Sequence, residues 1–156
     1  MILTATEADG RSIQDITARA GVFSEEEVQC VAELWQEYLV DGPEVCGYNF
    51  IVERDGDQIC GFACYGPRDL TSGVFDLYWV AVDPNCRRGG VGRRLLTASE
   101  EAARKAGGRM IIAETSGTSH YDETRKFYLG MGYTMEASIK DFYREGDDLA
   151  IFVKRF

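Results

Sequence analysis

A cluster of arginines and glycines in the middle of the chain is suited to binding an anion. It reads Arg87-Arg88-Gly89-Gly90-Val91-Gly92-Arg93-Arg94 and contains no acidic residue, although the net charge of the whole chain is -9. Glycine backbones can approach a ligand closely, and the unpaired N–H groups and dipole of a helix N-terminus favour negative charge. If a helix begins here, phosphate is the expected ligand.

The residues on either side predict a strand before this cluster and a helix after it. Val74–Val82 is rich in β-branched and aromatic residues and ends at the turn residues Asp83-Pro84-Asn85. From Val91 to Ala106, apolar or small residues recur every three or four positions, and Gly107-Gly108 ends the pattern. The cluster therefore lies in a turn between a strand and a helix N-terminus.

The spacing within the cluster excludes two common phosphate motifs. Neither the dinucleotide fingerprint G-x-G-x-x-G nor the P-loop G-x-x-x-x-G-K-[ST] occurs. Arg87-x-x-Gly90-x-Gly92 instead closely resembles the acetyl-coenzyme A signature of the GNAT superfamily of N-acetyltransferases. A structural turn in an unrelated α/β domain is the alternative interpretation.

Two later segments support the resemblance. Residues 127–133, Phe-Tyr-Leu-Gly-Met-Gly-Tyr, resemble the F-Y-x-x-x-G-[FY] segment of the family. Asp141-Phe142-Tyr143 followed by Gly146-Asp147-Asp148 resembles a segment of bacterial members, including those related to the ribosomal-protein alanine acetyltransferase. Two motifs in the right order are more specific than either alone.

The resemblance implies an activity and a cofactor-binding region. The implied reaction moves an acetyl group from the co-substrate acetyl-coenzyme A to a primary amine, by direct attack in a ternary complex and without a metal. A main-chain N–H of the strand at Val80, Ala81 or Val82 would polarise the thioester carbonyl. The residues implied to bind the cofactor pyrophosphate are Arg87, Arg88, Gly89, Gly90, Val91, Gly92, Arg93 and Arg94.

The resemblance also implies three candidates for proton transfer. Tyr128 corresponds to the family's general acid for the departing thiolate. Glu114 stands where N-terminal acetyltransferases carry a catalytic glutamate, and Asp76 stands where histone-type members carry theirs; we favour Glu114 as the base. Each carboxylate could instead be a hydrogen-bonded structural group, and Tyr128 a core residue. Tyr121 replaces an asparagine that contacts the cofactor arm in many members.

The remaining segments predict an α/β fold with a mixed sheet, in the order β-α-α-β-β-β-α-β-α-β-β, within a single domain spanning residues 1–156. This order matches the GNAT fold, in which the central strand splays from its parallel neighbour. An Asp-Gly pair predicts an antiparallel hairpin after residue 53, and the central helix predicts a parallel crossover. The expected strands are residues 2–6, 48–53, 58–64, 74–82, 110–115, 133–139 and 149–156, and the expected helices begin near residues 8, 24, 91 and 121.

Composition limits the function classes. Hydrophobic residues make up 45% of the 156 residues, as in ordinary globular proteins. No apolar run approaches the length of a membrane span and the N-terminus does not resemble a signal peptide, so we expect a cytoplasmic protein without membrane association. The acidic charge disfavours nucleic acid and suits a cationic substrate. Five cysteines and one histidine disfavour a zinc site, and Cys60 and Cys64 should share one face of their strand.

The acceptor amine, on a small molecule or a protein, is not specified by these patterns. The resemblance is compatible with a homodimer. Two other classes of function stay open: a non-catalytic acyl-coenzyme A sensor or regulatory domain, and an interaction domain without a small ligand.

Overall fold

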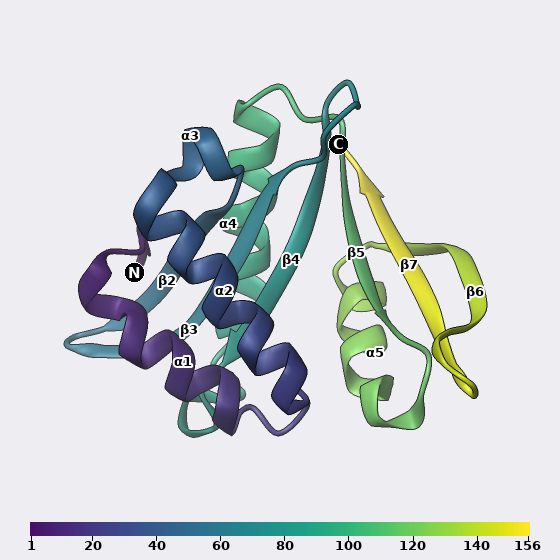
Figure 1. Cartoon of the computed structure of the whole chain (residues 1–156), viewed down its shortest axis with the longest axis horizontal. Helices are drawn as coiled ribbons and strands as arrows, with labels where there is room; N and C mark the ends of the chain where they lie inside the picture. The colour runs from purple at the N-terminus through teal and green to yellow at the C-terminus, as the bar shows by residue number, and fades with distance from the viewer.

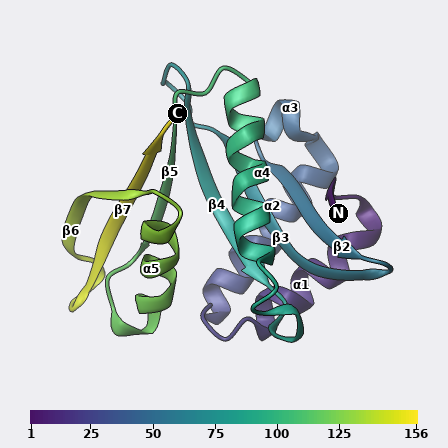
Figure 2. The same ribbon diagram turned by 180° about the vertical axis from the view of Figure 1, so that it is seen from behind.

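The computed structural model describes all residues from Met1 to Phe156 and contains one seven-stranded mixed sheet with helices on both faces (Figures 1 and 2). The strand order across the sheet is β1-β2-β3-β4-β5-β7-β6. The strands are β1 (Ile2–Thr4), β2 (Asn49–Asp55), β3 (Gln58–Pro67), β4 (Val74–Val82), β5 (Met110–Ser116), β6 (Thr134–Arg144) and β7 (Asp147–Arg155). The helices are α1 (Gly10–Arg19), α2 (Glu25–Asp41), α3 (Pro43–Cys46), α4 (Val91–Lys105) and α5 (Asp122–Gly130).

The element order confirms the mixed α/β fold predicted from sequence, with one short helix added. Asp41 ends α2, and Pro43 begins the single turn of α3. Proline is favoured at the first helical position because the N–H it lacks would have no intrahelical partner there. The final hairpin is tighter than predicted, since only Glu145 and Gly146 separate β6 from β7.

The sheet divides where β4 and β5 diverge. These two strands pair in parallel only from Val74–Leu77 to Met110–Ala113. Beyond Leu77, β4 continues to Val82 without pairing with β5, which remains paired to β7 as far as Ser116. The halves β1–β4 and β5–β7 therefore form a V that is open at one end (Figure 1).

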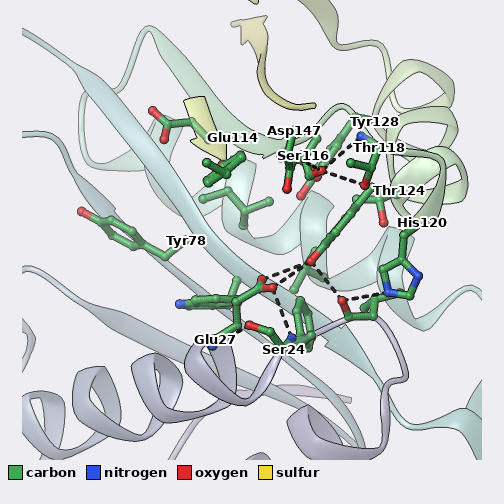
Figure 3. Close-up of a pocket in the computed structure, with 18 of the residues that line it drawn as sticks. Ser24, Glu27, Tyr78, Glu114, Ser116, Thr118, His120, Thr124, Tyr128 and Asp147 are labelled. Atoms are coloured by element: carbon green, nitrogen blue, oxygen red, sulfur yellow. Dashed lines mark hydrogen bonds between the residues drawn. The ribbon is translucent and has the colours of Figure 1, made fainter. Parts of the chain in front are cut away.

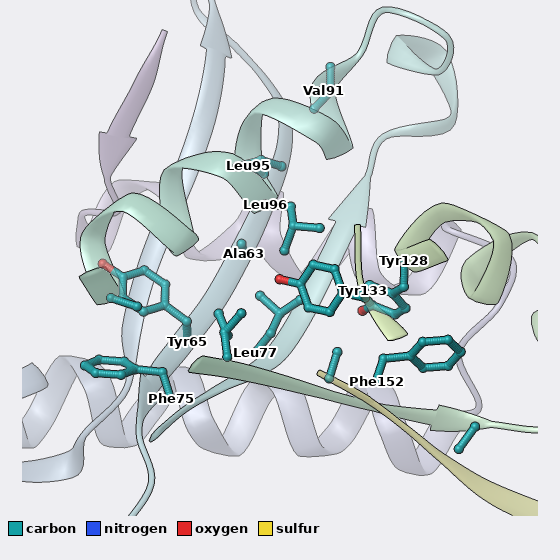
Figure 4. Close-up of a cluster of buried hydrophobic side chains, with 14 of the residues drawn as sticks. Ala63, Tyr65, Phe75, Leu77, Val91, Leu95, Leu96, Tyr128, Tyr133 and Phe152 are labelled. Atoms are coloured by element: carbon teal, nitrogen blue, oxygen red, sulfur yellow. The ribbon is translucent and has the colours of Figure 1, made fainter. Parts of the chain in front are cut away.

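Two hydrophobic clusters cover the two faces of the sheet. The larger one packs α4 and α5 onto both halves of the V through Leu77, Leu96, Tyr128 and Phe152 (Figure 4). Full burial of a side chain such as Leu96 stabilises the fold by about 2 kcal/mol. The other cluster packs α1 and α2 onto β2 and β3. The larger cluster holds the halves together and fixes their divergence.

The prediction that Cys60 and Cys64 share a face of β3 is wrong. Glu53 pairs with Gly61 while Arg54 pairs with Ile59, so Cys60 is the extra residue of a β-bulge. An extra residue shifts the alternation of side chains along a strand. Cys60 consequently joins the cluster beneath α4, and Cys64 joins the cluster beneath α1 and α2.

Candidate active site

A cleft of about 870 Å³ lies at the divergence of β4 and β5. Its walls come from β4, β5, the segment between α1 and α2, the start of α5 and the β6–β7 hairpin. Side chains from both halves of the V face one another across it (Figure 3). The three predicted catalytic residues, Tyr128, Glu114 and Asp76, all line this cleft.

Tyr128 presents a protonated hydroxyl to the cleft. Its ring is 6% exposed and packs against the rings of Tyr133 and Phe152, with centroid distances of 5.5 and 5.6 Å. No protein group forms a hydrogen bond with its hydroxyl, which remains accessible from the cleft. Burial raises the pKa of Tyr128 well above its usual value because the phenolate is poorly solvated there. The side chain is therefore both a core residue and an available proton donor.

Arg68 joins the two candidate carboxylates. It follows β3, and its Nε donates to both oxygens of Asp76 at 3.0 and 2.9 Å. Its Nη2 donates to Oε1 of Glu114 at 3.2 Å. Asp76 is buried, whereas the side chain of Glu114 is 40% exposed. Glu114 thus has the freer carboxylate, and Asp76 is held mainly by the guanidinium.

Main-chain N–H groups of β4 face the open side of the V. The N–H of Asp83 donates to the carbonyl of Cys60 across β3 at 2.8 Å. Alternate residues of an antiparallel strand turn their hydrogen-bonding groups to the same side, so Ala81 also faces β3. Val80 and Val82 therefore direct their N–H groups away from β3, and Val80 lines the cleft.

The arginine and glycine cluster forms the turn between β4 and α4. Asp83 accepts a hydrogen bond from the N–H of Asn85 and starts a short 3-10 helix, after which Arg88 and Gly90 adopt left-handed conformations with φ of 69° and 74°. None of the seven main-chain N–H groups from residue 87 to residue 93 has an acceptor within the protein. Such a row of free donors at a helix start is suited to a phosphate.

The four arginines of this turn are not equivalent. Arg94 donates through Nε to Oε1 of Glu53 at 2.9 Å and through Nη1 to the carbonyl of Gly89 at 2.7 Å. Arg87 donates to the carbonyl of Ala20. The guanidinium groups of Arg88 and Arg93 have no protein partner. Arg94 therefore shapes the turn, and the two unpartnered arginines are the freer cations.

Tyr121 connects the two walls of the cleft. Its hydroxyl lies 3.0 Å from the carbonyl oxygen of Val22 and 3.0 Å from Oε1 of Glu27, and His120 Nε2 lies 3.2 Å from the same carbonyl. Burial, followed by the charge of Glu27, raises the pKa of Tyr121 above its usual value. The segment between β5 and α5 is thus joined to the start of α2.

Comparison with known proteins assigns the chain to a family. The model of the acetyltransferase (GNAT) family matches residues 12–133. The chain belongs to the GNAT family of acetyltransferases. This confirms the resemblance carried by the residues around Gly90 and Tyr128 and makes acetyl transfer from acetyl-coenzyme A the reaction general to the family.

A sequence relative matches only in part. An amino-acid acetyltransferase of Pseudomonas paraeruginosa is 33% identical over 104 residues, which are 67% of this chain and 24% of that protein. This GNAT chain thus matches about a quarter of the relative's length.

Solved structures match over nearly the whole chain. A GNAT-family protein from Desulfovibrio desulfuricans superposes with a TM-score of 0.95 at 38% identity, covering 99% of this chain and 98% of that one. The ribosomal-protein-alanine N-acetyltransferase of Brucella melitensis gives 0.77 at 23% identity, covering 100% and 99%. A Salmonella typhimurium structure containing acetyl-coenzyme A gives 0.76 at 20% identity, covering 99% and 92%. The last two show the shared fold.

Two further features of the structure concern membrane-spanning helices and groups of metal-binding side chains. No helix is both long and apolar enough to cross a bilayer. No group of three or more histidine, cysteine, aspartate or glutamate side chains is arranged to hold a metal ion.

Sequence reasoning did not identify three residues of this site. Arg68 lies in a segment predicted only as a loop, and the pairing of Glu53 with Arg94 joins residues 41 positions apart. Tyr121 departs from the family motif in the sequence, but its contact with Glu27 spans 94 positions. No local pattern signals such distant pairings.

Proposed function

We propose that this protein transfers an acetyl group from acetyl-coenzyme A to a primary amine by direct attack within a ternary complex. The observation that carries the proposal is the row of unpaired N–H groups from residue 87 to residue 93, which follows the strand that opens the cleft. Tyr128 and the free N–H of Val80 face the same cleft. Phosphate binding and acyl transfer would therefore occupy adjoining parts of one site.

Two glycines of the turn leave space beside its main-chain amides, which supports a pyrophosphate site there. Gly89 and Gly92 do not adopt positive φ, and an added Cβ would meet protein atoms no nearer than 3.5 Å. The protein itself thus leaves room for a side chain at both positions. A ligand lying directly on the amides would use that space, which explains glycine there. Arg88 and Arg93 would supply compensating positive charge.

Acetyl-coenzyme A supplies the acetyl thioester: the protonated primary amine first gives up one proton, its nitrogen then bonds to the carbonyl carbon and loses a second proton, and the carbon–sulfur bond breaks. The products are an amide, a thiol that carries one of these protons, and one free proton. In our proposal the N–H group of Val80, which lines the cleft, stabilises negative charge on the carbonyl oxygen. Tyr128 donates its proton to the departing sulfur. Glu114, directly or through water, accepts a proton from the amine, while Arg68 and Asp76 position its carboxylate.

Two measurements test this function. Calorimetry with coenzyme A tests the turn, and release of free thiol from acetyl-coenzyme A in the presence of primary amines tests the reaction. Initial rates at varied concentrations of both substrates should give intersecting double-reciprocal lines, because a ternary complex precedes any product release. Parallel lines would indicate an acetylated enzyme instead. Binding without turnover for any amine would support a sensor, and no binding at all would reject both functions.

A further inference from the structure

We infer that the preferred acceptor carries a second positive charge beside the amine that is acetylated, as in a diamine or polyamine. The inference rests on the proposed function and concerns the acceptor side of the same cleft. Tyr128 marks the reacting end, because its ring is buried while its hydroxyl has no protein partner and faces the cleft. The charges and rings around the Tyr128 hydroxyl therefore surround an acceptor amine in the cleft.

Carboxylates from four different elements converge on the cleft. Glu27 lies on one wall and Glu114 and Asp147 lie opposite (Figure 3). Only two guanidinium groups and one imidazole line the same space. The carboxylates are Glu26 and Glu27 from α2, Asp76 from β4, Glu114 from β5 and Asp147 from β7.

The two guanidinium groups do not neutralise these carboxylates. Arg68 is shared by Asp76 and Glu114, so one positive charge faces two negative ones. Arg144 lies 3.9 Å from Asp147 and its side chain is 75% exposed. Glu27 receives a hydrogen bond from the neutral Tyr121 hydroxyl, and Glu26 has no hydrogen-bond or ion-pair partner at all. The cleft keeps a negative excess that an acceptor cation would offset.

Aromatic rings supply a second feature that favours cations. The rings of Phe23 and Trp79 meet edge to face at a centroid distance of 5.4 Å, and Tyr78 and Tyr143 also line the cleft. The face of an aromatic ring attracts an ammonium group, most strongly where water is partly excluded. These rings suit the alkyl chain and the distal amine of an extended acceptor.

The negative charge continues into an adjoining hollow of about 390 Å³. Arg68, Asp76 and Tyr78 line both spaces. Glu44 and Asp69 are added in the second, where Arg68 is the only basic residue. An acceptor with a terminal carboxylate would meet unfavourable charge in both spaces, because the shared guanidinium is already paired.

Three acceptors of equal chain length provide the test: 1,5-diaminopentane, pentylamine and 5-aminopentanoate. Each presents a primary amine, and they differ only in a positive, neutral or negative far end. We expect kcat/KM for the diamine to exceed that for pentylamine at least about tenfold at low ionic strength, with the anionic acceptor slowest. The preference should shrink as salt is added, because ions screen the attraction.

Two matched variants locate the effect. Glu26→Gln should lower the ratio of diamine to pentylamine kcat/KM by about threefold, in keeping with the small effect of one exposed charge. Glu25→Gln is the control, since Glu25 is in the same first turn of α2 but does not line the cleft, and its ratio should not change. Both changes remove the same favourable charge from the helix start.

The outcomes separate this inference from the proposed function. Equal kcat/KM values for the diamine and pentylamine, a preference for 5-aminopentanoate, or equal effects of Glu25→Gln and Glu26→Gln would each overturn the inference while leaving acetyl transfer intact. Coenzyme A binding without thiol release for these three or for any other primary amine would reject the proposed function first.

Discussion

Removing the hydroxyl of Tyr128 gives the sharpest test of the chemistry. The Tyr128→Phe variant keeps the ring, which packs against Tyr133 and Phe152. The hydroxyl has no hydrogen-bond partner in the protein, so its removal breaks no bond within the fold. We therefore expect the free energy of unfolding to change by less than about 0.5 kcal/mol, and the melting temperature by less than about 2 °C.

The expected loss of activity is much larger. A positioned proton donor contributes at least about 100-fold to the rate of a step in which it takes part. That factor corresponds to about 2.7 kcal/mol of transition-state stabilisation. Both kcat and kcat/KM should fall, with the affinity for coenzyme A unchanged, because the hydroxyl would act on the departing sulfur and not on the pyrophosphate.

The pH dependence adds an independent check. Burial raises the pKa of Tyr128 above the usual tyrosine value of about 10, so the hydroxyl stays protonated throughout the neutral range. The ratio of wild-type to Tyr128→Phe rates should therefore be constant between about pH 6 and pH 9. The assay is thiol release at saturating acetyl-coenzyme A, with a thermal melt of each sample.

Tyr133→Phe is the matched control. Its ring belongs to the same cluster, but its hydroxyl is buried, donates to Oε1 of Glu100 at 2.9 Å and does not line the cleft. This variant should lose about 1 kcal/mol of stability with activity retained. Equal turnover by Tyr128→Phe and the parent protein would refute the proton-donor assignment, as would a loss of rate matched by Tyr133→Phe.

Three further outcomes are expected. Glu114→Gln should slow turnover most near neutral pH and progressively less as pH rises, because the amine then loses its proton to water without a base. Equal turnover rates of the variant and the parent protein at every pH would reject Glu114 as the base. Gly90→Ala should cost about 1 kcal/mol of stability, because φ at Gly90 is 74° and a side chain is strained there. The same change should weaken coenzyme A binding measured by calorimetry. Undiminished binding would argue against the turn as the pyrophosphate site. The free energy of unfolding should fall as pH rises above about 10. Burial raises the folded-state pKa of Tyr128 and Tyr133, so only the unfolded chain releases those protons there; denaturant titrations showing equal stability at pH 9 and pH 11 would contradict this.

The fold was predictable where the signals are local. The strand, turn and helix around Gly90 follow from periodicity and glycine spacing within a single stretch of chain, and the structure has them at β4 and α4. The start of α2 near residue 24 was equally readable, since Ser24 and Glu27 form a capping box, a pattern of residues only three positions apart. Such features depend on contacts between residues only a few positions apart.

The charged contacts of the site were not predictable by the same means. The sequence presents the arginines near Gly90 as one positive group. In the structure, Arg94 is paired with buried Glu53 on a strand far away in the sequence. Arg68 likewise pairs with Asp76 and Glu114 only because β4 and β5 bring these two carboxylates beside it. Side-chain partners of this kind depend on sheet register, which a single sequence specifies weakly.

The divergence of β4 from β5 connects the fold to the proposed chemistry. Ending their pairing at Leu77 leaves the N–H groups of Val80 and Val82 without strand partners, a loss that water or a ligand must offset. The divergence persists because the cluster beneath α4 and α5, to which the Tyr128 ring belongs, includes residues of both halves. A ring of this cluster therefore carries a hydroxyl that shares the cleft with the free N–H group of Val80. Replacing Tyr128 with phenylalanine keeps the apolar face of α5, and therefore the divergence of β4 from β5, but removes the hydroxyl. The Tyr128→Phe variant thus separates the effect on architecture from the effect on catalysis.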